Sequence, residues 1–535
     1  MKHLPFILFS SAAALLISPR ASAEVYTWQT ADPATNVWST NAADANWYLG
    51  ANTVLTPWAD GNDAVFAGTG ETIAVTGTLT PLSTTVGAGD GNWTLTGAGV
   101  IGGTLVKEGS GTLTFGTGGS PYTGANTFTS TTINGGIVSI GSGGTGAATS
   151  NVNALGTGAI TINNGTLRLW IQNSATSTFT NNLTINGGTV LGEDGINIMS
   201  GTVNVGAGGA TFSSKWDGKT LTFSNVISGS GPVTVQRAPS NHTGPAVIMT
   251  AKNTYTGGTT VNSGILQLGT DVATQAGSVG IIVGDVTINS GATLRLSNIN
   301  AFGYGGGTKV NTVNINGGTL LHEANGDNGW GVTYNLTGGT MRSTSATGNF
   351  SFGGGTSVKT LEAAGSSVID GTVILREGNA TPQVVFNTAD GAALNDLVVN
   401  ATLSDNNGAR GIQKDGAGTM LLNGNSTYTG ATIVNGGTLA LGAFAQMSSS
   451  PITVNNGGTF RVDATGKFLS TITANNGATL GLIAKAGETT NVFNMLTLGD
   501  GGSISVAPSF ASRPIANQTF TLLSAVGVTG TSTIT

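Results

Sequence analysis

The feature that most constrains the fold is a unit that recurs along the chain. Residues 253–269 read NTYTGGTTVNSGILQLG, and residues 426–442 read STYTGATIVNGGTLALG. A looser copy, SPYTGANTFTSTTINGGIVSIG, occupies residues 120–141. Each copy runs from Tyr-Thr-Gly through a β-branched stretch and a glycine turn into alternating aliphatic residues. Strands this short cannot bury an apolar face alone, so the unit predicts that successive copies stack on one another.

A shorter element, a strand that ends in asparagine and turns through glycine, recurs more widely. Its asparagines are Asn134, Asn163, Asn186, Asn262, Asn289, Asn316, Asn435, Asn455 and Asn475. Apart from two long gaps, neighbouring copies are about 20 to 30 residues apart, and no helix-like segment separates them. Asparagine and glycine both tolerate positive φ, which suits a sharp corner. A period of this length is typical of a solenoid.

We therefore predict an all-β chain folded as a right-handed parallel β-helix. Ladders of Val, Ile and Leu should fill its interior, and Thr and Asn ladders should hydrogen-bond along the axis. The alternative is a string of antiparallel β-sandwich modules, because an Asn-Gly pair also fits a two-residue hairpin turn. Recurrence at one period over roughly 400 residues favours the β-helix.

Four segments are expected along the chain. Residues 1–23 have the features of a signal peptide, namely a basic start, a short apolar core and an Ala-Ser-Ala cleavage site. Residues 24–100 should form a Trp-rich N-terminal cap with the first coils, and residues 101–485 the repeat-bearing β-helix. Residues 486–535 should form the C-terminal coils, either complete or cut short. We expect no membrane-spanning segment after signal cleavage.

Four of the eight tryptophans fall within a short stretch of the expected cap. They are Trp28, Trp38, Trp47 and Trp58. One interpretation is a carbohydrate-binding surface, because indole faces suit sugar rings. The other is an apolar plug over the first coil, which we favour because the blunt end of a coil stack must be covered.

Composition excludes several classes of site and partner. The chain has no cysteine, which excludes disulfides, thiolate metal sites and cysteine nucleophiles. Only 8% of residues are charged, compared with about 25% in typical proteins. The signal segment holds two of the 19 basic residues, so the mature net charge is 17 − 25 = −8. Without a basic patch, nucleic acid is not an expected partner.

Few residues suit catalysis or metal binding, and we assign no catalytic, cofactor-binding or metal-ligating residue. The mature chain keeps only His242 and His322, each expected at the surface or at a strand end. Carboxylates of a polysaccharide lyase or hydrolase would be paired in space, and Glu193, Asp194 and Asp327 are the first to consider.

Three acidic turns carry oxygen ligands that calcium prefers. They are Asp60–Asp63, Asp90–Asn92 and Asn325–Asn328. None has the ligand spacing of an EF-hand or of the nonapeptide calcium repeats. We therefore expect ordinary turns in which Asp and Asn side chains bond to nearby backbone.

Four arginines follow the same kind of tripeptide, Gly-Thr-Leu or a close variant. They are Arg168, Arg295, Arg342 and Arg461. A shared position would give a cationic stripe along the rod that contacts anionic polysaccharide or lipopolysaccharide. The other interpretation, which we favour, is that these arginines keep exposed strand faces from aggregating.

The recurring units resemble the autotransporter-associated β-strand repeat, also called the passenger-associated transport repeat. The resemblance rests on the three copies above and on their leaders, Gly-Ser-Gly-Thr-Leu at 109–113 and Gly-Ala-Gly-Thr-Met at 416–420. In that family the repeat lies in extracellular passenger β-helices and assists export across the outer membrane. It has no catalytic residues to carry over.

The resemblance implies an exported, non-enzymatic surface or secreted protein, such as a stalk, passenger or adhesin. Expected partners are cell-surface glycans, other surface proteins and the secretion machinery. A polysaccharide-active enzyme and a carbohydrate-binding protein that uses the tryptophan block are the alternatives. A complete autotransporter ends in a membrane β-barrel, and the closing residues QTFTLLSAVGVTGTSTIT lack that pattern. We expect either another export route or a sequence that stops short of its natural end.

Overall fold

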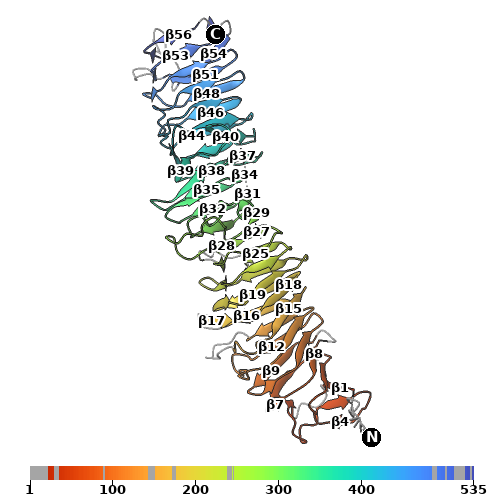
Figure 1. Cartoon of the computed structure of the whole chain (residues 1–535). Coiled ribbons are helices and arrows are strands. Elements are labelled where there is room, and N and C mark those ends of the chain that lie inside the picture. Colours follow the sequence, from red (N-terminus) through yellow and green to blue (C-terminus); the bar gives the residue numbers. More distant parts are fainter. Residues whose placement is uncertain are drawn as a thin grey trace, which may run out of the picture.

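The computed structural model is an elongated stack of β-strands with the first and last described strands at opposite ends (Figure 1). The structure describes residues 22–28, 35–87, 91–141, 151–171, 176–237, 244, 246–484, 491–499, 503–510, 524–530 and 533–534. Every regular element in these ranges is a β-strand, which confirms the all-β prediction. Most of the predicted signal segment lies outside the described residues. No helix of the described chain is long and apolar enough to cross a membrane.

Three long sheets form the sides of the stack, which makes about 18 turns. A spanning sheet runs the length of the rod by successive parallel pairings from β2 (Val37–Trp38) to β56 (Val528–Thr529). An 11-stranded N-terminal sheet ends at β24 (Ile227–Gly229). A 16-stranded C-terminal sheet begins at β17 (Thr176–Phe179) and ends at β57 (Thr533–Ile534). The predicted parallel β-helix is therefore confirmed.

Aliphatic side chains stack on one another through the interior, in register from turn to turn. Val261 pairs with Ile288, Ile288 with Ile315, and Ile315 with Leu336, and all four are buried. Each such side chain contributes about 1.5–3 kcal/mol when it leaves water. Register is tightly specified because a one-residue slip would turn this whole row outward.

The asparagines that end the short strands form the expected polar ladder. Asn435 donates its side-chain amide to Asp415 Oδ1 at 2.8 Å, and Asn455 donates to Asn435 Oδ1 at 2.7 Å. Asn475 continues the row to Asn455 at 2.6 Å. The second glycine after Asn435 is also constrained. Gly437 has φ +58°, and a Cβ there would lie 2.5 Å from the carbonyl oxygens of Ala417 and Gly418 in the preceding coil.

The tyrosine of the Tyr-Thr-Gly signature is buried and bonded within its own unit. Tyr255 shares a 2.6 Å hydrogen bond with Thr259 Oγ1, and Tyr428 does the same with Thr432 Oγ1. In the looser copy, Tyr122 donates to Asn126 Oδ1 at 2.5 Å. The partner is four residues on in each case. The signature recurs because a buried phenol needs a polar partner.

A buried lysine interrupts the aliphatic rows at the equivalent place in two repeats. Lys414 lies between Phe386 and Val434 in the ladder, and Lys107 occupies the corresponding place near the N-terminus. The Lys414 ammonium donates to the backbone carbonyls of Asp415, Gly416 and Gly436 at 2.9–3.1 Å. The aliphatic part of the Lys414 side chain continues the apolar row, while its ammonium group bonds the backbone carbonyls of the turns. Burial lowers the pKa of Lys414 to about 8.

The four N-terminal tryptophans plug the first coil. Trp28, Trp38, Trp47 and Trp58 are each at most 3% exposed. Trp47 packs edge-on against Trp28 with ring centroids 5.0 Å apart, and its ring is tilted against that of Trp58 with centroids 5.1 Å apart. Since the indole faces are buried against one another, the plug interpretation is confirmed and no face of these four rings is open to a sugar.

The repeats do not all occupy the same sides of the rod. In the first copy, β13 (Ser130–Ile133) lies in the N-terminal sheet and β14 (Ile137–Ile140) in the spanning sheet. In the second copy, the equivalent β27 (Thr259–Val261) lies in the spanning sheet and β28 (Gly264–Leu268) in the C-terminal sheet. The copy at 426–442 follows the second arrangement. The sequence repeat thus moves round the rod by one side between residues 141 and 259.

Replacing the signature tyrosine should loosen one part of the rod only. Tyr428→Ala should lower local stability by about 3–5 kcal/mol through the cavity it leaves, and Tyr428→Phe by about 1 kcal/mol through the lost hydrogen bond. Amide hydrogen exchange should speed up in peptides spanning 403–455 and stay unchanged near residue 120, because coils couple to their neighbours. Uniform acceleration along the whole chain would contradict this.

Candidate functional site

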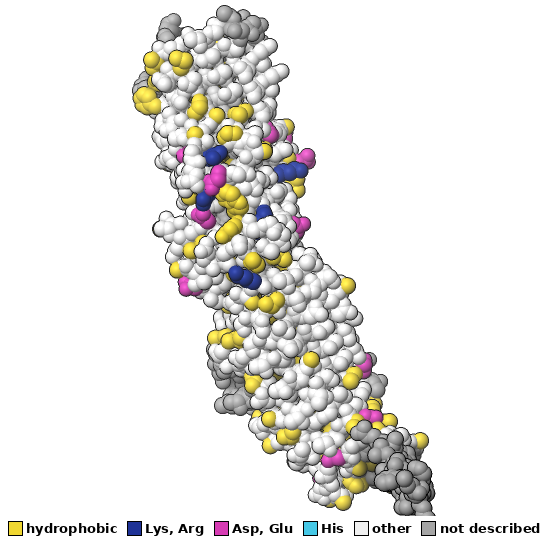
Figure 2. Space-filling view, viewed as in Figure 1, with side chains coloured by type: hydrophobic (Ala, Val, Ile, Leu, Met, Phe, Trp, Pro, Cys, Tyr) yellow, Lys and Arg dark blue, Asp and Glu magenta, His cyan; other side chains and the backbone are white. Residues whose placement is uncertain are grey.

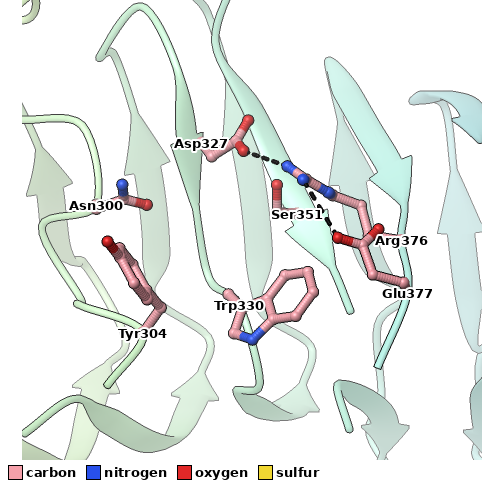
Figure 3. Close-up of a pocket in the computed structure, with 7 residues that line it drawn as sticks. All are labelled: Asn300, Tyr304, Asp327, Trp330, Ser351, Arg376 and Glu377. Carbon is pink, nitrogen blue, oxygen red and sulfur yellow. Dashed lines mark hydrogen bonds and ion pairs between the residues drawn. The ribbon is translucent and has the colours of Figure 1, made fainter. Parts of the chain in front are cut away.

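A pocket opens on the side of the rod near its middle, where loops and short strands of successive coils meet (Figure 3). Its volume is about 240 Å³, and its lining residues are Asn300, Tyr304, Asp327, Trp330, Ser351, Arg376 and Glu377. We call it the Trp330 pocket. On the face shown in Figure 2, Lys and Arg side chains lie beside Asp and Glu side chains over the middle and upper part of the rod.

A small fourth sheet positions the polar side of the Trp330 pocket. Its strands follow one another as β33 (Asp327–Asn328), β36 (Asn349–Phe352), β39 (Thr372–Leu375) and β42 (Thr402–Asp405). Asp327 opens the first strand, and Arg376 directly follows the third. Parallel stacking therefore brings together residues that are 49 positions apart in the sequence.

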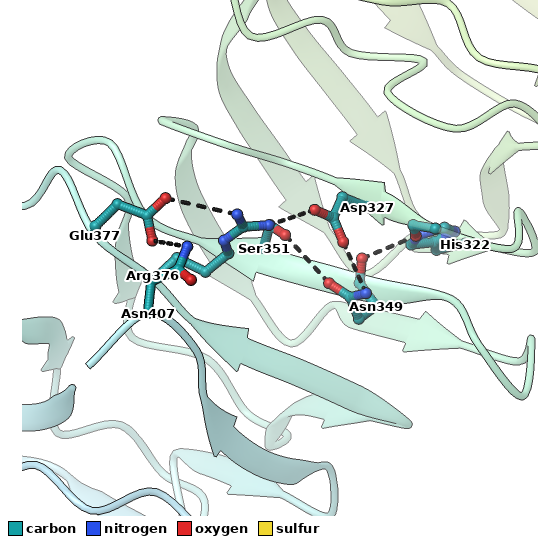
Figure 4. Close-up of polar contacts among 8 residues, drawn as sticks. His322, Asp327, Asn349, Ser351, Arg376, Glu377 and Asn407 are labelled. Atoms are coloured by element: carbon teal, nitrogen blue, oxygen red, sulfur yellow. Dashed lines mark hydrogen bonds and ion pairs between the residues drawn. The ribbon is translucent and has the colours of Figure 1, made fainter. Parts of the chain in front are cut away.

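Arg376 joins two carboxylates in the pocket (Figure 4). Its Nη1 lies 2.5 Å from Asp327 Oδ2, and its Nη2 lies 3.5 Å from Glu377 Oε1. Each carboxylate has a further donor behind it: Asn349 donates to Asp327 at 2.9 Å, and Asn407 donates to Glu377 at 3.2 Å. All three charged side chains are 20–37% exposed, so their pairing fixes geometry more than it adds stability.

Two glycines leave the space that the aromatic side of the pocket occupies. The Trp330 ring lies so close to Gly353 and Gly354 that added Cβ atoms would approach it to 2.6 and 2.3 Å. The Arg376 guanidinium lies 5.5 Å from the centroid of the same ring. Tyr304 is 46% exposed. In Figure 3 the two aromatic side chains lie along one side of the pocket and Asp327 along the other.

The electrostatics of the pocket favour the ionised form of Glu377. Its own backbone N–H, the Asn407 amide and Arg376 together hold the pKa of Glu377 below its usual range, against the opposing effect of burial. A glycosidase needs one carboxylic acid that holds a proton near neutral pH. The arrangement suits hydrogen-bond acceptance by fixed carboxylates, with Arg376 and Asn300 as donors.

His322 lies buried behind the pocket. It ends β32 (Thr319–His322), as a strand-end histidine should, but it is fully buried rather than at the surface. Its Nε2 lies 2.8 Å from the Gly326 carbonyl and 3.0 Å from the Asn349 carbonyl, so it donates to backbone. Burial lowers the pKa of His322, which leaves the ring neutral. His242 lies outside the described residues.

The other carboxylates considered from the sequence do not join Asp327. Glu193 and Asp194 lie on β19 (Gly188–Asp194), many turns nearer the N-terminus. Glu193 pairs with Lys215, and Asp194 pairs with Lys219 at 2.8 Å. Within the described ranges there is no group of three or more His, Cys, Asp or Glu that could hold a metal.

The acidic turns bond to nearby backbone and side chains. Asp60 accepts from the Thr80 backbone N–H at 2.7 Å and from the Trp58 indole at 2.8 Å. Asn92 accepts from the Thr112 N–H at 2.8 Å, while Asp90 lies outside the described residues. Asp327 departs from the expectation, because its carboxylate faces Arg376 in the pocket rather than its own turn.

The four arginines do not form one stripe. Arg168 lies on β16 (Thr166–Trp170) of the spanning sheet, whereas Arg295, Arg342 and Arg461 lie on strands of the C-terminal sheet. The prediction of one stripe was wrong for Arg168, because the shared repeat position lies on a different side of the rod before and after the repeat moves round it.

Carboxylates also neutralise part of the set. Arg461 pairs with Asp463 at 2.7 Å, and Arg295 lies 3.6 Å from Glu323. Arg168 donates to Ser139 at 2.9 Å and packs over Trp170. Such side chains suit solubility better than a continuous cationic surface.

Asp327 is the one lining residue of the Trp330 pocket that the sequence indicates as a candidate. The others went unnoticed because they come from different coils. Two signals were present: Trp330 stands between glycines, and Arg376 and Glu377 are adjacent in a chain that is only 8% charged. Neither signal identifies a pocket until the coils are stacked.

Comparisons with known proteins agree with the repeat assignment. The sequence model described as passenger-associated-transport-repeat matches residues 105–140, 246–268 and 412–441. The chain is 27% identical over 394 residues to a protein of Brucella suis biovar 1 (strain 1330) named adhesin BmaC autotransporter. That alignment covers 66% of this chain and 10% of the Brucella protein, so the chain spans about a tenth of that relative. No solved structure matches significantly.

Acid should loosen the coils around His322. A buried histidine with a lowered pKa takes up its proton less readily in the folded chain than in the unfolded one. Stability is then fully present above about pH 6.5 and falls as the pH drops below that value. Hydrogen exchange of peptides spanning 319–352, corrected for intrinsic rates, should accelerate from pH 6.5 to pH 5.0. His322→Gln should flatten this dependence, and an unchanged slope in the variant would contradict the assignment.

Proposed function

We propose, from the passenger-associated transport repeats that the chain carries, that it is the rod-like passenger portion of an exported surface protein. Its role is a non-enzymatic stalk that holds binding surfaces away from the cell. The observation that supports this most is the uninterrupted stack of parallel coils, from the tryptophan plug at one end to the last described strands at the other.

The architecture suits export followed by folding. Each coil contacts mainly its neighbours, so coils can add one at a time as the chain emerges. The chain has no cysteine and few charges, and its cohesion comes from aliphatic ladders that need neither disulfides nor metal. Extracellular surface or secreted localisation follows from this proposal.

An adhesive role is the finer part of the proposal. Its support is the printed name of the Brucella relative together with a surface pocket in the middle of the rod. Both carboxylates are paired with Arg376, and the pKa of Glu377 is held below its usual range, which favours binding over cleavage of a ligand there.

Surface display tests the stalk proposal. In the producing cells, the tagged chain should be reached by antibody on intact cells, and the rod should resist proteinase K while its flexible tags are cut. The double variant Tyr255→Ala and Tyr428→Ala should reach the surface in amounts several-fold lower, because two repeats then stack poorly. The double Phe variant of the same positions is the matched control and should stay near wild type.

Two results would contradict the proposal. One is a chain that stays inside intact cells or is degraded throughout by the protease. The other is release of oligosaccharide from a polysaccharide panel in a manner that Asp327→Asn abolishes, because this would make the protein an enzyme.

A further inference from the structure

We propose that the Trp330 pocket is a binding subsite for one ring of a neutral saccharide. This deepens the adhesive part of the proposed function, which draws on the same pocket, and it goes beyond the stalk role, which needs no ligand and can hold or fail independently. The inference rests on the size of the pocket, the placement of its aromatic rings and the balance of its charges.

The size of the pocket limits the ligand. Its volume of about 240 Å³ lies below the 300–1,000 Å³ that is common for sites that enclose a drug-sized molecule. A single sugar ring is of the right order, and the rest of a chain could extend along the open side of the rod. Its position on the side of a rod, away from the capped end, also suits an extended polymer.

The aromatic groups are placed to receive an apolar face. Trp330 lies against the Cα atoms of Gly353 and Gly354, so its ring has little freedom to rotate. Tyr304 is 46% exposed. Aromatic rings that are fixed and partly exposed lose little conformational entropy on binding, and they pack well against the C–H face of a sugar.

The charges select a neutral ligand. Arg376 stands between Asp327 and Glu377, so the pocket carries one positive and two negative charges. An anionic sugar would meet two carboxylates, and a free cation would have to displace the guanidinium. A hydroxyl group both donates and accepts, which matches carboxylate acceptors beside guanidinium and amide donors.

The polar groups are already held in place. Asn349 fixes Asp327, Asn407 fixes Glu377, and the buried hydroxyl of Ser351 donates to Asn349 Oδ1 at 3.1 Å. Figure 4 shows these contacts as one continuous network. Groups fixed before the ligand arrives pay less ordering entropy on binding, which favours recognition by a shallow site.

The test is saccharide binding by the full exported chain. The probes are cellohexaose, maltohexaose, laminarihexaose and mannohexaose, with hexagalacturonate as the anionic counterpart. Binding is measured by titration calorimetry and by saturation-transfer NMR. Tyr304→Ala removes an exposed ring from the pocket, and Phe444→Ala removes a 78% exposed ring elsewhere on the rod as the matched control.

At least one neutral hexasaccharide should bind, and Tyr304→Ala should weaken it about tenfold while Phe444→Ala stays within about twofold of wild type. Glu377→Gln should also weaken it, with the exchange pattern of the rod unchanged. The proposal is overturned if no neutral probe binds at 10 mM, if Tyr304→Ala binds as well as wild type, or if hexagalacturonate binds more tightly than every neutral probe.

Discussion

The in-register stacking of aliphatic side chains between successive coils is the interaction on which the rest of this structure depends. Rows such as Val261, Ile288, Ile315 and Leu336 bury each residue beneath its counterpart. The other features are compatible with this stacking. Asparagine ladders and glycines form the turns between strands, and each signature tyrosine bonds a polar side chain of its own repeat. Tryptophans cover the first coil because the row would otherwise end in water.

Much of the fold could be predicted because it is local and repeated. A strand, an Asn-Gly corner and a second strand are read from neighbouring residues, and their period implies stacking. The side of the rod on which a repeat lies could not be predicted, because it depends on how many residues each intervening turn consumes. Arg168 was therefore grouped with Arg295, although their strands lie in different sheets. The burial of Lys414 could not be predicted, because nothing in the neighbouring residues shows that its side chain lies in an interior row.

The candidate site likewise has one part that the sequence predicts and another that it does not. The sequence indicates Asp327 as a candidate carboxylate, but its place in the site depends on its ion pair with Arg376. Arg376 is 49 positions later and two strands away in the small sheet. A solenoid builds sites between coils, so the lining residues share no motif. In a chain with few charges, an ion-paired cluster beside two aromatic rings differs clearly from the Thr- and Asn-rich surface around it.

Small-angle X-ray scattering of the mature chain tests the stacked-coil account most directly. About 18 turns at 4.8 Å per turn predict a rod on the order of 90–100 Å long once the ends are included. The distance distribution should be skewed, with a long tail, and the cross-section should stay constant along the rod. A symmetric distribution with a radius of gyration near 24 Å, as expected for a compact globule of about this length, would contradict the account.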